Sequence, residues 1–165
     1  MYIHTAIEDL KLRKAEVKDI GRILELIKEI AIYEKMLEEV IATEDSLKKS
    51  IFENKEATVL LIEEKAVVIG YVIYFFNYST FVGKKGFYLE DMYIKKEYRE
   101  KGYGKEIFKI MGSIAYEEEC ERMEWICLDW NTPSINFYKS LGAEAMSQWT
   151  IYRLTREKIK KLSEG

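Results

Sequence analysis

The sequence predicts an α/β domain in which helices cover both faces of a mixed, largely antiparallel sheet. Two neighbouring segments, residues 57–62 and 66–78, are rich in Val, Ile, Leu, Tyr and Phe and have the composition of paired strands. A strand, a helix and another strand follow between residues 87 and 130, and such a unit predicts parallel pairing with a right-handed connection. The 165 residues suffice for one sizeable core, so we expect a single domain over residues 1–165.

The N-terminal part predicts one strand and two helices after a loose lead-in at residues 1–8. Apolar and basic residues alternate over residues 9–14, which is the period of a half-buried strand. Thr43, followed by two acidic residues, predicts the N-cap of a short helix that ends near Phe52. Before it, residues 18–36 predict an amphipathic helix whose apolar face is formed by Ile20, Ile23, Leu24, Ile27, Ile30 and Ala31.

The middle of the chain predicts consecutive antiparallel strands. The polar residues 63–65 separate the two strands at 57–62 and 66–78 and therefore predict a hairpin. Residues 78–84 form the next expected connection, and aromatic and branched side chains then dominate residues 87–94.

Residues 99–104, Arg-Glu-Lys-Gly-Tyr-Gly, lie where the strand at 87–94 gives way to a helix from Tyr103 to about Glu119. Glycines at such a turn let the backbone approach a ligand, and the free amides at the helix start attract an anion. The pattern predicts a phosphate site and suits a pyrophosphate.

The glycine pattern by itself leaves two interpretations open, because a short Gly-x-Gly also occurs in turns that bind nothing. It differs from the dinucleotide fingerprint G-x-G-x-x-G, since Ile107 occupies the third glycine position. It also differs from a P-loop, since no Gly-Lys-Ser/Thr follows four spacer residues.

The C-terminal part predicts a strand, a helix and a last strand. Residues 123–130 are strand-like, and ligands usually bind at the C-terminal edge of such a parallel unit. Thr132 is the expected N-cap of the next helix, with Pro133 at its first position and Gly142 at its end. Residues 143–155 are strand-like again, and residues 158–165 form a charged tail that we expect to be frayed.

Composition and charge exclude several classes of function. Hydrophobic residues make up 48% of the chain and charged residues 33%, as in ordinary globular proteins. A net charge of −3 and a pI near 5.5 argue against a nucleic-acid partner and suit a cationic ligand. His4 is the only histidine, which argues against a Ser-His-Asp triad and a histidine-ligated metal.

Cysteine usage and hydropathy indicate a cytoplasmic protein. Cys120 and Cys127 lack a metal-ligand spacing, and we interpret them as reduced core residues. No apolar run is long enough to span a membrane, and there is no signal peptide. We therefore expect neither a metal nor a membrane partner.

Two motifs, residues 99–104 and Asn-Thr-Pro-Ser-Ile-Asn-Phe-Tyr at 131–138, resemble the GNAT superfamily of N-acetyltransferases. The resemblance covers about residues 9–155 and implies a three-layer α-β-α domain. Three more fragments are similar to the diamine/polyamine (spermidine/spermine) and thialysine branch. They are Leu-Ile-Lys-Glu-Ile-Ala-Ile-Tyr-Glu at 26–34, Tyr-Leu-Glu-Asp at 88–91 and Asp-Trp-Asn at 129–131.

This resemblance implies direct transfer of acetyl from acetyl-CoA to a primary amine, without an acyl-enzyme. An amine of pKa about 10.4 is neutral in roughly one molecule per thousand near pH 7.4, so a carboxylate is expected to take its proton. Glu90 matches the family's substrate-side acid, although an edge-strand charge or an ion-pair partner is the alternative interpretation. In a regular strand Asp91 points to the opposite face, and a bulge would change that.

Tyr138 matches the family's general acid, which protonates the departing CoA thiolate, whereas its alternative interpretation is a core aromatic. Tyr33 and Glu34 match substrate positions, and their alternative is a snorkelling aromatic beside a solvated carboxylate. The full implied substrate set is Tyr33, Glu34, Glu90, Glu124, Trp125 and Ile126. The implied cofactor set, with backbone amides holding the pyrophosphate and the strand pairing with pantetheine, is Met92, Tyr93, Ile94, Arg99, Glu100, Lys101, Gly102, Tyr103, Gly104, Lys105, Asn131 and Ser134.

Two departures from the polyamine enzymes bear on the substrate. Residues 78–80, Tyr-Ser-Thr, lack an acid that those enzymes carry and are similar to the thialysine-acetylating relatives; residues 147–148 lack another. Fewer carboxylates hold a long polycation less well, so a short diamine or a lysine-like amine is as much expected as spermidine. The family is commonly dimeric, and we expect a homodimer.

Two other functions stay open at this point. A protein-modifying acetyltransferase would act on lysine or N-terminal amines through a peptide groove. An acetyl-CoA-binding regulator would keep residues 99–104 but would need neither Tyr138 nor Glu90, so their joint presence argues against it.

Overall fold

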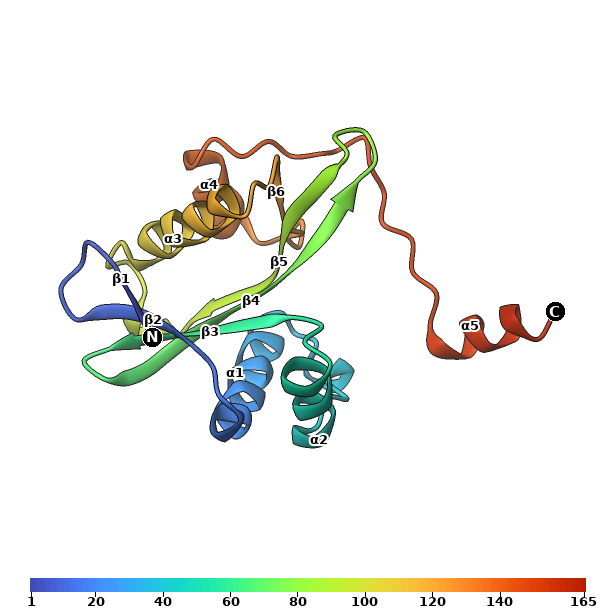
Figure 1. The fold of residues 1–165 in the computed structure, drawn as a ribbon, viewed down its shortest axis with the longest axis horizontal. Coiled ribbons are helices and arrows are strands. Elements are labelled where there is room, and N and C mark those ends of the chain that lie inside the picture. Colours follow the sequence, from blue (N-terminus) through green and yellow to red (C-terminus); the bar gives the residue numbers. More distant parts are fainter. The chain divides into compact units, whose positions relative to one another are not determined.

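A six-stranded sheet forms the centre of the fold (Figure 1). The computed structural model describes residues 1–165, and the chain forms two compact units, Met1–Leu128 and Asp129–Gly165. The sheet belongs to the first unit; its strands lie in chain order, and all neighbours are antiparallel except β5 and β6. The strands are β1 (Tyr2–His4), β2 (Leu10–Lys14), β3 (Thr58–Glu64), β4 (Val67–Ser79), β5 (Lys84–Ile94) and β6 (Met123–Glu124).

Helices cover both faces of this sheet (Figure 1). On one face lie α1 (Ile20–Tyr33) and α2 (Glu44–Leu47), which continues as a π-helical turn, Lys48–Glu53; α3 (Tyr103–Glu117) lies on the other. This arrangement confirms the predicted three-layer α/β fold around a mixed, largely antiparallel sheet. The second unit contains α4 (Thr132–Ser140) and α5 (Arg156–Ser163).

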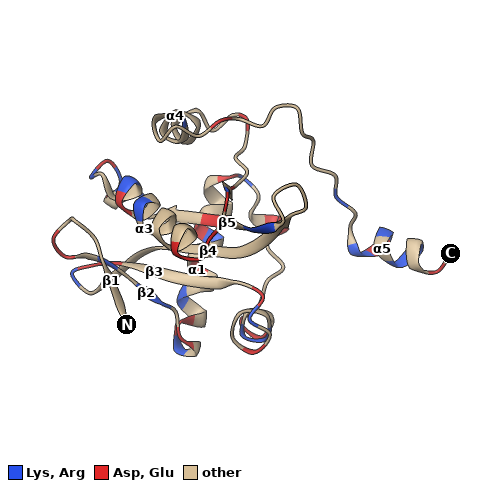
Figure 2. Ribbon diagram, turned by 45° about the horizontal axis from the view of Figure 1, so that its top comes forward, with Lys and Arg blue, Asp and Glu red and all other residues tan.

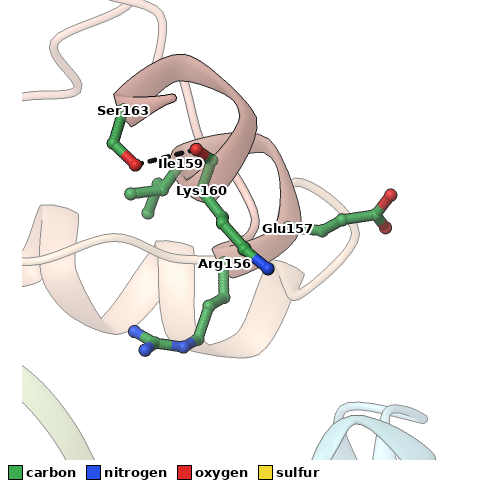
Figure 3. Close-up of a pocket in the computed structure, with 5 residues that line it drawn as sticks. All are labelled: Arg156, Glu157, Ile159, Lys160 and Ser163. Atoms are coloured by element: carbon green, nitrogen blue, oxygen red, sulfur yellow. Dashed lines mark hydrogen bonds between the residues drawn. The ribbon is translucent and has the colours of Figure 1, made fainter. Parts of the chain in front are cut away.

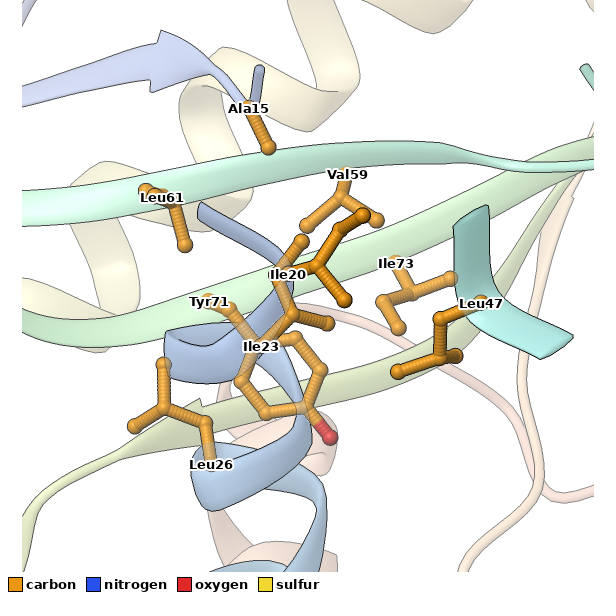
Figure 4. Close-up of a cluster of buried hydrophobic side chains, with 9 residues drawn as sticks. All are labelled: Ala15, Ile20, Ile23, Leu26, Leu47, Val59, Leu61, Tyr71 and Ile73. Atoms are coloured by element: carbon orange, nitrogen blue, oxygen red, sulfur yellow. The ribbon is translucent and has the colours of Figure 1, made fainter. Parts of the chain in front are cut away.

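The core between α1 and the sheet is almost wholly aliphatic (Figure 4). Its buried members are Ala15, Ile20, Ile23, Leu26, Leu47, Val59, Leu61, Tyr71 and Ile73. Burying one such aliphatic side chain contributes about 1.5–3 kcal/mol, so this face supplies much of the stability. The predicted apolar face of α1 is confirmed, with Leu26 as an additional buried residue. Tyr71 is the one aromatic residue in the set, and it carries a polar group.

A buried ion-pair network joins β2 to β3. The guanidinium of Arg13 lies 2.7 Å from the Asp19 carboxylate and 2.6 Å from that of Glu63. Asp19 also accepts the backbone N–H of Glu16 at 2.8 Å. Removing one partner of such a buried network costs about 3–5 kcal/mol, so it fixes the alignment of both strands at the start of α1.

The first helices and the hairpin confirm the sequence predictions with shifted bounds. The Thr43 hydroxyl accepts the backbone N–H of Ser46 at 3.1 Å, as expected of an N-cap. The hairpin turn is shorter than residues 63–65, because Glu63 and Glu64 continue β3. Lys65 and Ala66 make the turn with φ of 49° and 64°, the left-handed backbone that a two-residue hairpin requires.

Two predictions for the sheet were wrong. Residues 1–8 are not a loose lead-in throughout, because β1 pairs with β2 along its whole length. The strand predicted over 123–130 is limited to the two residues of β6, although its parallel pairing with β5 is confirmed. Beyond β6 the Trp125 ring packs edge-on against Phe108 of α3, with ring centroids 5.3 Å apart, and the chain leaves the sheet.

Three predictions for the second unit were also wrong. Residues 143–155 form no strand, since an alternating pattern makes a strand only when a partner strand pairs with it. The expected frayed tail contains α5, which i,i+4 ion pairs such as that of Lys161 with Glu157 support. The N-cap of α4 is Asn131 rather than Thr132.

The cysteines are free, as predicted, but they are only partly buried and so are not core residues. None of the helices combines the length and the apolar character needed to cross a membrane.

Candidate active site

A left-handed glycine begins α3. Gly102 is the N-cap and has φ 79°, a conformation that explains the glycine. A side chain built on Gly102 would meet no atom within 4 Å, so the space beside this turn is open. The first amides of α3 have no partner within the helix, which suits the predicted pyrophosphate site.

Side chains of the glycine loop tie it to β3. The Tyr103 hydroxyl donates to the Glu64 carboxylate, and the Lys101 ammonium lies 3.5 Å from the same group. The hydrogen bond with Glu64 raises the pKa of Tyr103 to about 12. Tyr103 is buried, so it anchors the loop on one side. Lys105 is exposed, so its ammonium group stays available to bind an anion. Basic and acidic residues follow one another along the exposed side of α3 (Figure 2).

Arg99 links the end of β5 to the end of α1. Its Nε donates to the Ile94 carbonyl at 2.8 Å. Its guanidinium carbon lies 5.0 Å from the Tyr33 ring centroid and 5.3 Å from that of Tyr93. Arg99 and Tyr33 therefore have structural contacts with each other, and their roles toward cofactor and substrate stay predictions.

The second half of β5 has one free edge. β6 pairs with β5 only at Phe87 and Tyr88. Met92, Tyr93 and Ile94 pair with β4 alone. This edge fits an extended chain with amide groups, as the predicted pantetheine contact requires.

A β-bulge occurs in β5 at Glu90. Ile73 of β4 faces Asp91, and the next residue, Tyr74, faces Leu89, so Glu90 has no opposite partner. The strand is therefore not regular, and alternation does not send Asp91 to the face opposite Glu90. Asp91 lies on the face of Ile73, which is the α1 side of the sheet. Bulges often re-aim side chains beside active sites.

Three carboxylates gather on this α1 side. The buried Tyr71 hydroxyl donates to Asp91 at 3.1 Å. Burial raises the pKa of Asp91; burial and the charge of Asp91 raise the pKa of Glu34. Burial raises the pKa of Tyr71 well above its usual value, and the charges of Asp91, Glu34 and Glu90 add to the effect. Glu34, Glu90 and Asp91 therefore all act on the Tyr71 hydroxyl, and the substrate roles of Glu34 and Glu90 stay predictions.

An aromatic pair extends this surface toward β6. The Tyr88 and Phe75 rings lie 5.0 Å apart. Burial, followed by the charges of Glu90 and Glu124, raises the pKa of Tyr88. Glu124 forms an ion pair with Arg122 at 3.1 Å, which supports a structural role for that predicted substrate residue.

The other residues predicted at this end of the sheet have different surroundings. Trp125 packs on α3, whereas Ile126 is exposed. Their substrate roles stay predictions.

Three predicted residues lie in the second unit. The Asn131 side chain accepts the Ser134 backbone N–H at 3.5 Å and caps α4. Tyr138 lies on α4 with its ring centroid 5.7 Å from that of Phe137, and both rings are partly buried. The roles of Asn131, Ser134 and Tyr138 stay predictions.

A shallow depression on α5 has no catalytic character (Figure 3). It is lined by Arg156, Glu157, Ile159, Lys160 and Ser163. The Ser163 hydroxyl is bound to the Lys160 carbonyl at 2.8 Å, so no activated nucleophile is present. The chain has no cluster of three or more potential metal ligands.

Sequence reasoning missed Tyr71 and gave Asp91 only a secondary place. Tyr71 lies in a run of apolar residues and has the signature of a core position. A bulge leaves no mark in an alternating pattern, so the orientation of Asp91 could not be read from spacing.

The chain matches the acetyltransferase (GNAT) family over residues 21–143. It is 34% identical over 164 residues to thialysine N-epsilon-acetyltransferase of Bos taurus, covering 92% of this chain and 96% of that protein. It is 28% identical over 200 residues to L-ornithine N5-acetyltransferase NATA1 of Arabidopsis thaliana, covering 93% and 88% of the two chains.

Solved structures show the same fold. An integron cassette protein from the mobile metagenome of V. cholerae superimposes with a TM-score of 0.79 at 21% identity, covering 96% of this chain and 100% of that one. At this identity the likeness concerns the fold alone.

Proposed function

Because this chain belongs to the acetyltransferase (GNAT) family, we propose that it transfers acetyl from acetyl-CoA to a primary amine of a small diamine, polyamine, thialysine or lysine-like substrate. One observation supports a positively charged amine as the acetyl acceptor. Glu34 and Asp91 are partly buried carboxylates, and neither takes part in an ion pair. Carboxylates with raised pKa values and no cation beside them indicate a site for a cationic ligand.

The chain's own residues supply binding and proton transfer. Acetyl-CoA brings the acetyl group as a thioester. The amides at residues 102–105 hold the pyrophosphate, the free edge of β5 holds the extended arm, and Asn131 and Ser134 add polar contacts. Glu90 accepts the proton of the substrate ammonium, directly or through water, which offsets the cost of about 4 kcal/mol for reaching the neutral amine. Tyr138 donates a proton to the departing sulfur.

Two of the relatives support a short substrate. The bovine and Arabidopsis proteins are named for thialysine and for ornithine, each of which carries a side-chain amine. The absence of acids at residues 78–80 and 147–148 favours the same class over a long polyamine. The homodimer stays a prediction from the resemblance, and the cytoplasmic location stays a prediction from cysteine usage and hydropathy.

We expect Gly104→Val to weaken CoA binding by about tenfold or more, because a side chain in the first turn of α3 occupies space that the ligand needs. Helix stability does not suffer, since Val has a better helix propensity than Gly. Calorimetric titration with CoA measures the effect. Gly112→Ala, an exposed position of the same helix with no atom within 4 Å, is the control and raises stability by about 1 kcal/mol without changing affinity. Unchanged affinity in Gly104→Val contradicts the assignment of the loop.

A panel of amines with acetyl-CoA tests the proposed function, with release of free CoA thiol as the readout. The panel contains diamines, spermidine, thialysine, lysine, ornithine and a lysine-containing peptide. Rapid turnover of the small amines supports the proposal. Turnover of the peptide alone indicates a protein acetyltransferase, and CoA binding without any turnover indicates a regulator.

A further inference from the structure

Tyr71 places a hydroxyl where the core needs none. It lies on β4 with 0% exposure, among aliphatic side chains (Figure 4). Burying a hydroxyl is costly unless it is hydrogen-bonded, and a phenylalanine would fill the same space without that cost. The hydroxyl donates to Asp91 at 3.1 Å. The Tyr71 hydroxyl therefore contributes a hydrogen bond to Asp91 and is not needed for packing.

The bulge at Glu90 brings Asp91 to Tyr71. Without the extra residue, Asp91 would lie on the α3 side of the sheet, as Leu89 does two positions before it. With it, Asp91 faces Ile73, two residues from Tyr71 on the same side. Bulge and hydroxyl are separate features of two strands, and both fix the same carboxylate.

Glu34 approaches from another element. It is the C-cap of α1, and the preceding Tyr33 ring is held against the Arg99 guanidinium. Charge repulsion from Asp91 contributes to the raised pKa of Glu34. The charges that act on the Tyr71 hydroxyl are those of Asp91, Glu34 and Glu90, and none of these groups is a cation. The nearby Arg99 instead binds the Ile94 carbonyl and the two tyrosine rings.

We propose that Tyr71 is a positioning residue: its buried hydroxyl holds the Asp91 carboxylate beside Glu34, and this pair receives the second cationic group of the amine substrate. The inference rests on the proposed function and narrows its substrate class. The enzyme then prefers an amine with a second positive charge to a monoamine of equal length, while Glu90 acts on the reacting nitrogen.

The test compares 1,5-diaminopentane with pentylamine, two primary amines that differ only in the second ammonium group. In the unaltered protein kcat/KM is higher for the diamine. In Tyr71→Phe the diamine-to-monoamine ratio falls about tenfold, as expected for a lost hydrogen bond to a charged group. The ratio falls because the KM of the diamine rises, while kcat and the KM of acetyl-CoA stay unchanged.

A pH profile separates positioning from packing. The Tyr71 hydrogen bond lowers the pKa of Asp91, so its loss raises that pKa further. The rise in diamine KM on acidification therefore begins at a higher pH in Tyr71→Phe, and high pH restores part of the loss. If Tyr71 had a purely structural role, Tyr71→Phe would lower the melting temperature and leave the pH dependence of the diamine KM unchanged.

Two further variants complete the experiment. Tyr74→Phe removes a hydroxyl from the other face of β4, where the ring stacks on Phe87 at 4.5 Å, and leaves the ratio unchanged. Tyr71→Phe added to Asp91→Asn has no further effect on the ratio, because both act on one group.

An unchanged ratio in folded Tyr71→Phe, or a full effect of Tyr71→Phe in the Asp91→Asn background, overturns the proposal. Equal use of both amines by the unaltered protein also overturns it and leaves the proposed function standing. Turnover of neither amine, nor of any other in the panel, overturns the proposed function itself.

Discussion

Replacing Tyr138 by phenylalanine lowers kcat by at least about 100-fold, the lower end of what general acid catalysis contributes. The proton is needed as the C–S bond breaks, so the loss appears in kcat, and the affinity for acetyl-CoA stays nearly constant. Stability changes little, because Phe keeps the ring beside Phe137 on α4. Steady-state kinetics and a thermal melt measure both effects.

Tyr152→Phe is the matched control, since its side chain is 92% exposed in the same unit, and it leaves kcat unchanged. A loss confined to the KM of acetyl-CoA in Tyr138→Phe would mean that the hydroxyl only anchors the cofactor. Full activity would show that the thiolate leaves unaided and that Tyr138 is a packing residue.

Glu90→Gln lowers the rate at neutral pH by about 100- to 10,000-fold, because the substrate ammonium loses its proton acceptor. High pH restores part of the rate, since the fraction of neutral amine grows tenfold with each pH unit below the amine pKa. Rates of thiol release from pH 6 to 10, with the diamine as substrate, measure this recovery. Glu97→Gln, an exposed acid beyond the end of β5, keeps the original profile.

The shape of the profile decides the role of Glu90. If Glu90→Gln keeps the original pH profile and rate, another group, such as a water chain, removes the proton. A uniform loss at every pH would assign Glu90 to binding alone. Partial recovery at high pH is expected only if the carboxylate takes up a proton during turnover.

Local patterns were sufficient for much of the fold. The apolar face of α1, the β3–β4 hairpin and the turn before α3 each depend on residues close in sequence, and the structure has all three. The N-cap at Thr43 was equally predictable, because a hydroxyl followed by acids is a short-range signal. The assignment of Glu34 and Glu90 to the substrate followed from a family match and not from pattern, and it stays a prediction.

Features that depend on distant partners were not predictable. The length of β6 depends on where Trp125 packs against α3, and the strand expected at 143–155 needed a partner from elsewhere. The bulge at Glu90 is a register shift between two strands, which neither strand shows alone. The contact of Tyr71 with Asp91 depends on that shift, so the residue could only be classed as core before the structure was known.

The central claim is acetyl transfer to a small cationic amine, and product analysis tests it most directly. The unaltered protein is incubated with acetyl-CoA and 1,5-diaminopentane, and mass spectrometry quantifies the acetylated amine beside the free CoA thiol. We predict monoacetylated diamine in an amount equal to the thiol released, with the protein itself unmodified. Thiol release without any acetylated amine, or acetyl groups found only on protein lysines, would contradict the account.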